Sequence, residues 1–134
     1  LICAMECALR LATENLEDKL AYVKSLKAQV QKELQSYDKV VINSTECSSP
    51  FILNFSLKGM KSREMTYQLD EAGIYVSTKS ACCPENAVSK PVYAITKDRK
   101  LALNPVRISF SDRTTTEEIE EFLANFKRIY ESLK

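Results

Sequence analysis

The first 36 residues carry the pattern that most restricts the fold of this chain. Apolar side chains recur there at steps of three or four residues, as on one face of an α-helix, and neither proline nor glycine interrupts the run. The apolar positions are Met5, Leu9, Ala12, Leu16, Leu20, Val23, Leu26, Val30 and Leu34. We therefore expect one long helix over residues 1–36. Because its length of about ten turns exceeds the average for a compact domain, we expect either a helix at a domain boundary or a simple long packing helix.

Strand and helix patterns alternate along the rest of the chain. We expect strands at residues 40–42, 51–57, 74–76 and 106–110, helices at 62–72 and from Thr115 onward, a helical turn at 91–96, and a loop over 78–90. Thr115 and Glu118 have the spacing of a capping box. This order predicts a single α+β domain over residues 1–134, a two-layer sandwich whose helices pack on one face of a small, mostly antiparallel sheet.

Length and charge exclude several classes of protein. The chain has 134 residues, of which 45% are hydrophobic and 28% charged, as in one soluble globular domain. Its formal net charge of +1 provides no general attraction for nucleic acid or an anionic membrane. No apolar run approaches the roughly 20 residues that span a bilayer. Because residue 1 is Leu rather than Met, we expect the chain to begin inside a longer parent protein.

Cysteine and histidine usage restricts the possible chemistry. The five cysteines are irregularly spaced and odd in number, which favours reduced thiols in the cytosol over a secreted disulfide framework. The chain has no histidine, so it contains no Ser-His or Cys-His nucleophile pair. Cys82 and Cys83 are adjacent but have no second cysteine pair nearby, so we expect no metal site.

The segment Ser77-Thr78-Lys79-Ser80-Ala81-Cys82-Cys83-Pro84 is the first candidate site. It places two thiols in a loop of small residues directly after a predicted buried strand, a common position for reactive groups. Lys79 is close in sequence and could favour the nucleophilic thiolate. The alternative is that Cys82 and Cys83 are ordinary small buried residues.

Arg107 is the second candidate. In the alternating strand over residues 106–110, Val106 and Ile108 face the core, so Arg107 points to the opposite face. A guanidinium group there could hold a carboxylate through two parallel hydrogen bonds. The alternative is a solvated surface arginine.

Three segments together resemble the group I cysteine desulfurases, the NifS and IscS type within the class V aminotransferase family. Ile52-Leu53-Asn54-Phe55-Ser56 is similar to the I-L-N-x-S strand of that family, and Ser77-Thr78-Lys79-Ser80-Ala81-Cys82 to its S-S-G-S-A-C loop. Residues 106–111, followed by 115–119, resemble its I-R-[FI]-S-x-[SG] and T-T-x-E-[ED]-[IV] stretch. The order and spacing of these segments agree with those of the family motifs over nearly the whole chain. The resemblance implies the C-terminal small domain of a fold type I pyridoxal phosphate (PLP) enzyme.

The resemblance implies roles for individual residues. Cys82 aligns with the catalytic cysteine, which attacks the sulfur of the cofactor-bound L-cysteine and becomes a persulfide while L-alanine is released. Arg107 aligns with the arginine that holds the substrate carboxylate. Lys79 stands where the family usually has glycine, and could stiffen the loop or lower the pKa of the thiol. Cys83 stands where many members have Ser or Thr, and could share the persulfide or itself be the nucleophile.

The family's PLP lysine lies in an S-H-K motif, and a chain without histidine does not contain that motif. We therefore expect an N-terminal domain of the parent to bind PLP, and this fragment to bind none and to be inactive alone. The resemblance further implies a cytoplasmic parent enzyme, dimeric through its larger domain. It also implies a protein that accepts sulfur for iron–sulfur clusters or thiolated RNA.

Two other functions remain open from the sequence. The domain could be a non-catalytic interaction module whose thiols are structural or accept sulfur from another enzyme. It could also belong to a related fold type I enzyme such as a selenocysteine lyase. A thiol in the 77–84 loop argues against a plain aminotransferase, which needs no nucleophilic cysteine.

Overall fold

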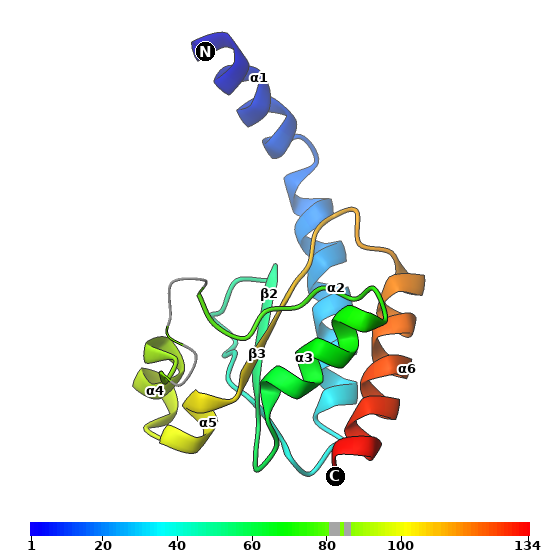
Figure 1. The fold of residues 1–134 in the computed structure, drawn as a ribbon. Coiled ribbons are helices and arrows are strands. Elements are labelled where there is room, and N and C mark those ends of the chain that lie inside the picture. The colour runs from blue at the N-terminus through cyan, green and yellow to red at the C-terminus, as the bar shows by residue number, and fades with distance from the viewer. Residues whose placement is uncertain (81–83, 85–86) are drawn as a thin grey trace.

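The computed structural model describes residues 1–80, 84 and 87–134 (Figure 1). Within that part, the helices and strands are α1 (Ile2–Thr13), α2 (Leu16–Leu34), β1 (Val40–Ile42), β2 (Ile52–Leu57), α3 (Ser62–Glu71), α4 (Lys90–Thr96), α5 (Arg99–Leu103), β3 (Pro105–Ser109) and α6 (Thr116–Leu133). The predicted helical turn at 91–96 is confirmed as α4, whereas the sequence analysis missed α5.

The three strands form one antiparallel sheet in the order β1-β2-β3. Leu53 of β2 lies opposite Ile108 of β3, and Phe55 lies opposite Val106, so these four side chains share one face of the sheet. All four are buried. The predicted α+β fold with a small antiparallel sheet is therefore confirmed.

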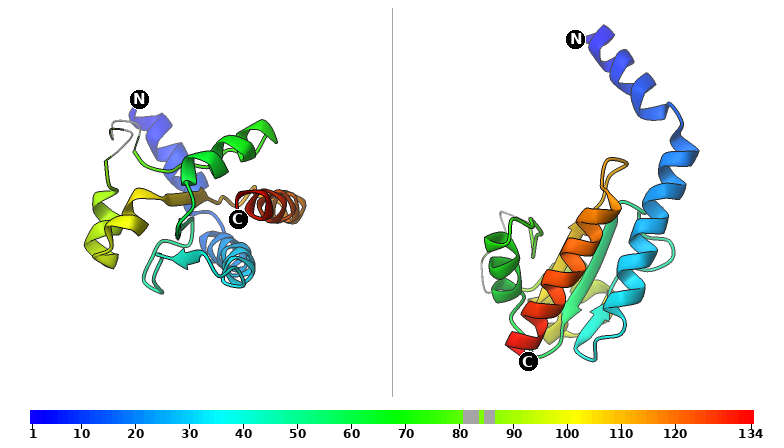
Figure 2. Two further views of the ribbon diagram at one scale, coloured as in Figure 1. Left: turned by 60° about the horizontal axis from the view of Figure 1, so that its bottom comes forward. Right: turned by 90° about the vertical axis from the view of Figure 1, so that its right-hand side faces the viewer.

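The main core lies between this apolar face and helices α2, α3 and α6. The ring of Phe126 on α6 is fully buried and lies at the centre of an aromatic cluster. Its ring centroid is 5.3 Å from that of Tyr37, 5.8 Å from those of Phe55 and Phe122, and 6.0 Å from that of Tyr130. Edge-to-face pairs at such separations add to the stabilisation from apolar burial. Figure 2 shows α2 and α6 side by side along the sheet.

The other face of the sheet is covered only in part. The short helices α4 and α5 lie on that side (Figure 2), and Ala102 of α5 is fully buried. Ser56 and Pro105, a cross-strand pair on this face, are buried as well. At the next pair along the same face, Asn54 and Arg107, the cover is incomplete. The sequence analysis had expected helices on one face alone.

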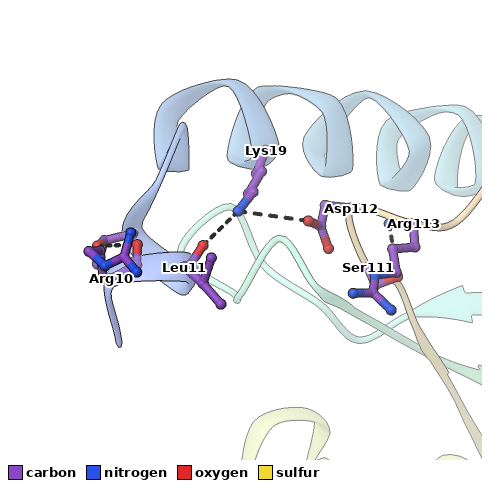
Figure 3. Close-up of polar contacts among 7 residues, drawn as sticks. Arg10, Leu11, Lys19, Ser111, Asp112 and Arg113 are labelled. Atoms are coloured by element: carbon purple, nitrogen blue, oxygen red, sulfur yellow. Dashed lines mark hydrogen bonds and ion pairs between the residues drawn. The ribbon is translucent and has the colours of Figure 1, made fainter. Parts of the chain in front are cut away.

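The predicted single helix over residues 1–36 is two helices. Asn15 adopts a left-handed conformation with φ of 53°, which asparagine tolerates better than most residues, and it separates α1 from α2. Helix α1 has no buried residue and extends away from the rest of the molecule (Figure 1). Figure 3 shows how Lys19 bridges the break. Its Nζ donates to the carbonyl oxygen of Leu11 at 3.1 Å and lies 4.0 Å from the carboxylate of Asp112.

The prediction of a strand at residues 74–76 is wrong. Pairing is limited to an isolated bridge at the next residue, where Ser77 exchanges two backbone hydrogen bonds with Arg107. Gly73, with φ of +78°, ends the turn after α3, and Ile74 and Val76 pack against the core without a partner strand. The alternating apolar pattern therefore reflects packing against the core rather than a ladder of hydrogen bonds.

Among the described helices, none combines the length and apolarity that a membrane span requires. No group of three or more potential metal-ligating side chains occurs in the described part of the chain.

Candidate functional site

A cavity of about 790 Å³ lies on the incompletely covered face of the sheet. Asn54 and Arg107 on the sheet, residues of α4, the β1–β2 loop and the segment around residues 78–89 line it. Lys79, Lys90 and Arg107 contribute three cationic side chains, whereas none of the described lining residues is Asp or Glu. This cavity therefore favours an anionic ligand.

Arg107 lies on β3 with an exposed side chain that lines this cavity, as the alternation of the strand predicted. Its backbone N–H and C=O both pair with Ser77, so its position is fixed from one side by that bridge. Within the described part of the chain, the guanidinium group forms no ion pair or hydrogen bond. A guanidinium group with five donors and no partner among the described residues, in a cavity whose described lining has no Asp or Glu, is suited to bind a carboxylate or phosphate.

Two asparagines stand beside Arg107. Asn54 lies directly opposite Arg107 in the register of β2 and β3, and Asn43 follows the end of β1. The Asn43 side chain donates from Nδ2 to Asn54 Oδ1 and to Ser56 Oγ, each at 2.8 Å. Asn43 is 5% exposed, and its Oδ1 has no hydrogen-bond partner among the described residues. These two amides therefore form a connected polar group on the floor of the cavity.

The structure describes only some of the predicted site residues in the segment that contains the two cysteines. Lys79 is half-buried and lines the cavity, and its Nζ donates to the carbonyl oxygen of Ala87 at 2.7 Å. This bond joins two points eight residues apart in the 78–90 segment. Cys82 and Cys83 lie outside the described residues. Ser80 and Pro84, the nearest described residues on either side of the two cysteines, both line the cavity.

The β1–β2 loop, which forms another rim of the cavity, is tied to α2. Lys27 Nζ donates to the carbonyl oxygen of Ser49 at 2.9 Å, and Ser49 is a lining residue. Partial burial lowers the pKa of the Lys27 ammonium group, because desolvation disfavours its charged form. The contact holds the loop, and with it one wall of the cavity, against the core helix α2.

Sequence reasoning missed the roles of Asn43, Asn54 and Lys90. Asn54 was placed correctly on the face opposite the core, but it was considered only as part of a motif. A polar side chain at this position of a strand could have indicated that Asn54 lines a site. Asn43 was given no role from the sequence, and its burial follows only from the pairing of β1 with β2. The three other cysteines, Cys3, Cys7 and Cys47, are free thiols and do not line the cavity.

The described lining residues do not by themselves fit PLP. The pyridinium nitrogen of that cofactor is normally paired with an acidic side chain, and the described part of the cavity has none. Its cations suit the anionic part of a substrate or cofactor and leave the ring nitrogen without a partner. The described residues of this chain therefore do not form a complete PLP site.

Comparisons with known proteins agree on one family. Residues 1–122 match the family described as Aminotransferase class-V. The NifS/IcsS protein homolog of Lactobacillus delbrueckii subsp. bulgaricus is 32% identical over 133 residues, which cover 97% of this chain and 34% of that protein. The chain thus spans about a third of the length of this curated relative.

Solved structures share the fold. A NifS-like protein superposes with a TM-score of 0.82 and 26% identity, over 94% of this chain and 32% of that chain. The cysteine desulfurase CsdA from Escherichia coli superposes with a TM-score of 0.66 and 20% identity, over 85% of this chain and 26% of that one. At 20% identity, the second likeness is evidence of a common fold alone.

Proposed function

The chain belongs to the aminotransferase class-V family, and on that premise we propose that it is the C-terminal domain of a PLP-dependent cysteine desulfurase. The parent enzyme converts L-cysteine to L-alanine and retains the sulfur as a persulfide on Cys82. The observation that carries the proposal is the cationic cavity, which has Arg107 on its floor and the residues flanking Cys82 on its rim.

Arg107 binds the carboxylate of L-cysteine in this proposal. Its guanidinium group is exposed to the cavity and faces no described acidic residue that would compete for it. A bidentate pair with a carboxylate also fixes the direction of the substrate, because two parallel N–H···O bonds define a plane. The sulfur of the bound substrate then points along a defined direction.

Cys82 acts as the sulfur acceptor. Its thiolate attacks the sulfur atom of L-cysteine, so that an S–S bond forms while the C–S bond of the substrate breaks. The electron pair of the broken bond passes to the β-carbon, which takes up a proton and completes L-alanine. PLP bound by the rest of the parent enzyme would supply the electron sink that lets the β-carbon depart with this electron pair. The persulfide on Cys82 is then available to a sulfur-accepting protein.

The rest of the parent enzyme supplies what this chain lacks. We assign PLP to the part of the parent protein that corresponds to the two thirds of the curated relative outside the match. The apolar residues Ile2, Met5 and Leu9 of α1 are exposed, which supports the proposal that this helix lies at a domain boundary of the parent. We further propose that the parent is a cytoplasmic homodimer. The chain alone is then expected to be inactive and to bind no PLP.

The test uses the parent enzyme with L-cysteine as substrate. We expect release of L-alanine, and a persulfide that alkylation and peptide mass spectrometry assign to Cys82. Cys82→Ala should abolish both products, and Cys83→Ala should leave the persulfide on Cys82. The matched control is Cys47→Ala, because Cys47 is an exposed thiol on the β1–β2 loop and not a lining residue. It should behave like the wild type.

Two results would overturn the proposal. The first is a parent enzyme that forms no L-alanine from L-cysteine. The second is a persulfide that persists in the Cys82→Ala variant. For the isolated chain, an absorbance band after addition of PLP that borohydride removes would contradict the assignment of the cofactor to the rest of the parent.

A further inference from the structure

We propose that Asn54 is a second donor for the substrate carboxylate, beside Arg107, and that Asn43 is a positioning residue that sets the orientation of the Asn54 amide. The inference rests on the proposed function only in naming an amino-acid carboxylate as the ligand. The site itself follows from the strand register, the hydrogen bonds and the cavity lining.

The register brings the two donors together. Arg107 directs its backbone N–H and C=O toward Ser77, and Asn54 directs its own toward the β1 side, where its carbonyl oxygen accepts from Asn43 N at 2.9 Å. Asn54 and Arg107 are therefore a non-hydrogen-bonded pair of the antiparallel ladder. In such pairs the Cα atoms are about 4.5 Å apart and the side chains lie closer than in hydrogen-bonded pairs. Both side chains emerge on the face that lines the cavity.

The hydrogen bond from Asn43 determines which end of the Asn54 amide faces the cavity. Asn54 Oδ1 accepts from Asn43 Nδ2 at 2.8 Å, so the oxygen end is occupied. The NH₂ end forms no hydrogen bond with any described residue and is not among the buried unsatisfied atoms. Two amide N–H donors are thus available at the cavity, next to the guanidinium group of Arg107.

The opposite orientation is less favourable. If both amides were turned over, Asn54 Nδ2 and Ser56 Oγ would donate to Asn43 Oδ1, and the Asn43 NH₂ group would be buried without an acceptor. That leaves two buried donors unsatisfied, whereas the observed orientation leaves one buried acceptor, Asn43 Oδ1. An unsatisfied buried polar group costs free energy whichever kind it is, so the orientation with fewer of them is preferred.

A carboxylate suits this pair of donors. One oxygen can accept from the guanidinium group and the other from the Asn54 amide, and Lys79 and Lys90 add favourable charge around the cavity. The guanidinium group is carried on a long side chain with several rotatable bonds, and a second donor on the neighbouring strand restricts movement of the bound carboxylate together with that side chain. Asn54 therefore contributes both to affinity and to the discrimination of amino acids from the corresponding amines.

The first experiment measures ligand binding by this 134-residue chain without turnover. Proton–nitrogen correlation spectra are recorded during titration with L-cysteine and with cysteamine, which has the same amine and thiol but no carboxylate. L-Cysteine should shift the Asn54 side-chain NH₂ resonances and the Arg107 Nε–H resonance with the same apparent Kd. Cysteamine should shift neither. Movement of Arg107 without Asn54 would overturn the inference.

The second experiment compares variants of the parent enzyme. Asn54→Asp exchanges the NH₂ donor for an oxygen, and Asn54→Leu removes it without adding charge. Loss of a hydrogen bond to a charged ligand group predicts a rise in the KM for L-cysteine of about 10- to 100-fold, with kcat within about threefold. The control Asn125→Asp makes the same chemical change on α6, at a residue that does not line the cavity, and should leave both constants unchanged. Equal KM values for Asn54→Leu and the wild type would refute the assignment.

The positioning role of Asn43 is tested by the response of the Asn54 NH₂ resonances in Asn43 variants. In Asn43→Asp the carboxylate can only accept, so the Asn54 amide should turn, donate to residue 43 and present its oxygen to the cavity. The Asn54 NH₂ resonances should then no longer respond to L-cysteine, although Asn54 is unchanged. If that variant does not fold, Asn43→Ser, which is small and uncharged, should weaken binding at least threefold. Binding unchanged in the folded variants would contradict the role.

Failure of this inference differs from failure of the proposed function. If the parent enzyme releases no L-alanine but the Asn54 and Arg107 resonances of this chain shift only with the carboxylate ligand, the proposed reaction is refuted and the binding site is retained. If the parent enzyme is active but its KM for L-cysteine is unchanged by Asn54→Leu, the role of Asn54 is refuted and the proposed function is retained.

Discussion

Deletion of residues 1–13, which removes α1, should change the free energy of unfolding of this chain by less than about 1 kcal/mol. Helix α1 buries no side chain, so its loss removes nothing from the core. The contact across the break runs from Lys19 Nζ to the Leu11 carbonyl oxygen and is exposed to solvent. Exposed polar contacts of this kind contribute at most about 1 kcal/mol. The thermal midpoint should accordingly fall by less than about 5 °C.

The assay is urea unfolding of the full chain and of the shortened chain, followed by circular dichroism and tyrosine fluorescence, since the chain has six tyrosines and no tryptophan. The slope of the free energy against urea should also be nearly unchanged, because α1 exposes most of its surface already in the folded state. Phe126→Ala is the contrasting variant. It removes a fully buried ring and should cost about 3–5 kcal/mol.

Hydrogen exchange provides an independent check on the same prediction. A helix of 12 residues that buries no side chain is marginally stable in water, so the amides of α1 should exchange much faster than those of α2. Light scattering at two protein concentrations controls for association through the exposed apolar side chains. A loss of more than about 2 kcal/mol on deletion, in a protein that is monomeric at both concentrations, would refute the reasoning.

Two further predictions concern α6. Thr115→Ala removes the hydroxyl oxygen that accepts from Glu118 N at 3.2 Å, and should cost about 1 kcal/mol in urea unfolding, while Thr115→Ser should cost clearly less. Desolvation and the hydrogen bond to Asp38 raise the pKa of the Tyr130 hydroxyl, so the folded state holds this proton more tightly than the unfolded state. This contribution to stability is complete below the unfolded pKa of about 10 and is lost as the pH rises above it. The stability difference between wild type and Tyr130→Phe should therefore shrink between pH 9 and 11, and a constant difference would contradict the assignment.

Much of the candidate site was accessible from the sequence. The alternation of residues 106–110 placed Arg107 away from the core, and the cavity lining agrees with that. The three motifs predicted the family, which the comparisons confirm. The role of Cys82 stays a prediction, because residue 82 lies outside the described part of the chain. The roles of Asn43 and Asn54 were not predicted, since each depends on a neighbour in another strand.

The elements that were predicted correctly depend on residues close together in the chain. These elements follow from local patterns. Apolar residues recur at steps of three or four positions in α2 and α6, Thr115 begins a capping box, and apolar and polar residues alternate in β2 and β3. The same reasoning joined α1 to α2, because no proline or glycine interrupts the pattern and only the left-handed conformation of Asn15 reveals the break. It also assigned a strand to residues 74–76, where apolar alternation occurs without a partner strand.

The sequence by itself determined most of the helical and extended segments, which of their faces are apolar, and to which family the chain belongs. Only the tertiary structure decided that Asn43, Asn54 and Arg107 meet on one face of the sheet. The physical reason is that backbone hydrogen bonds between strands do not depend on side-chain identity, so many registers are locally possible. The selection among them is made by burial of the opposite face, where Leu53, Phe55 and their partners pack against α2, α3 and α6.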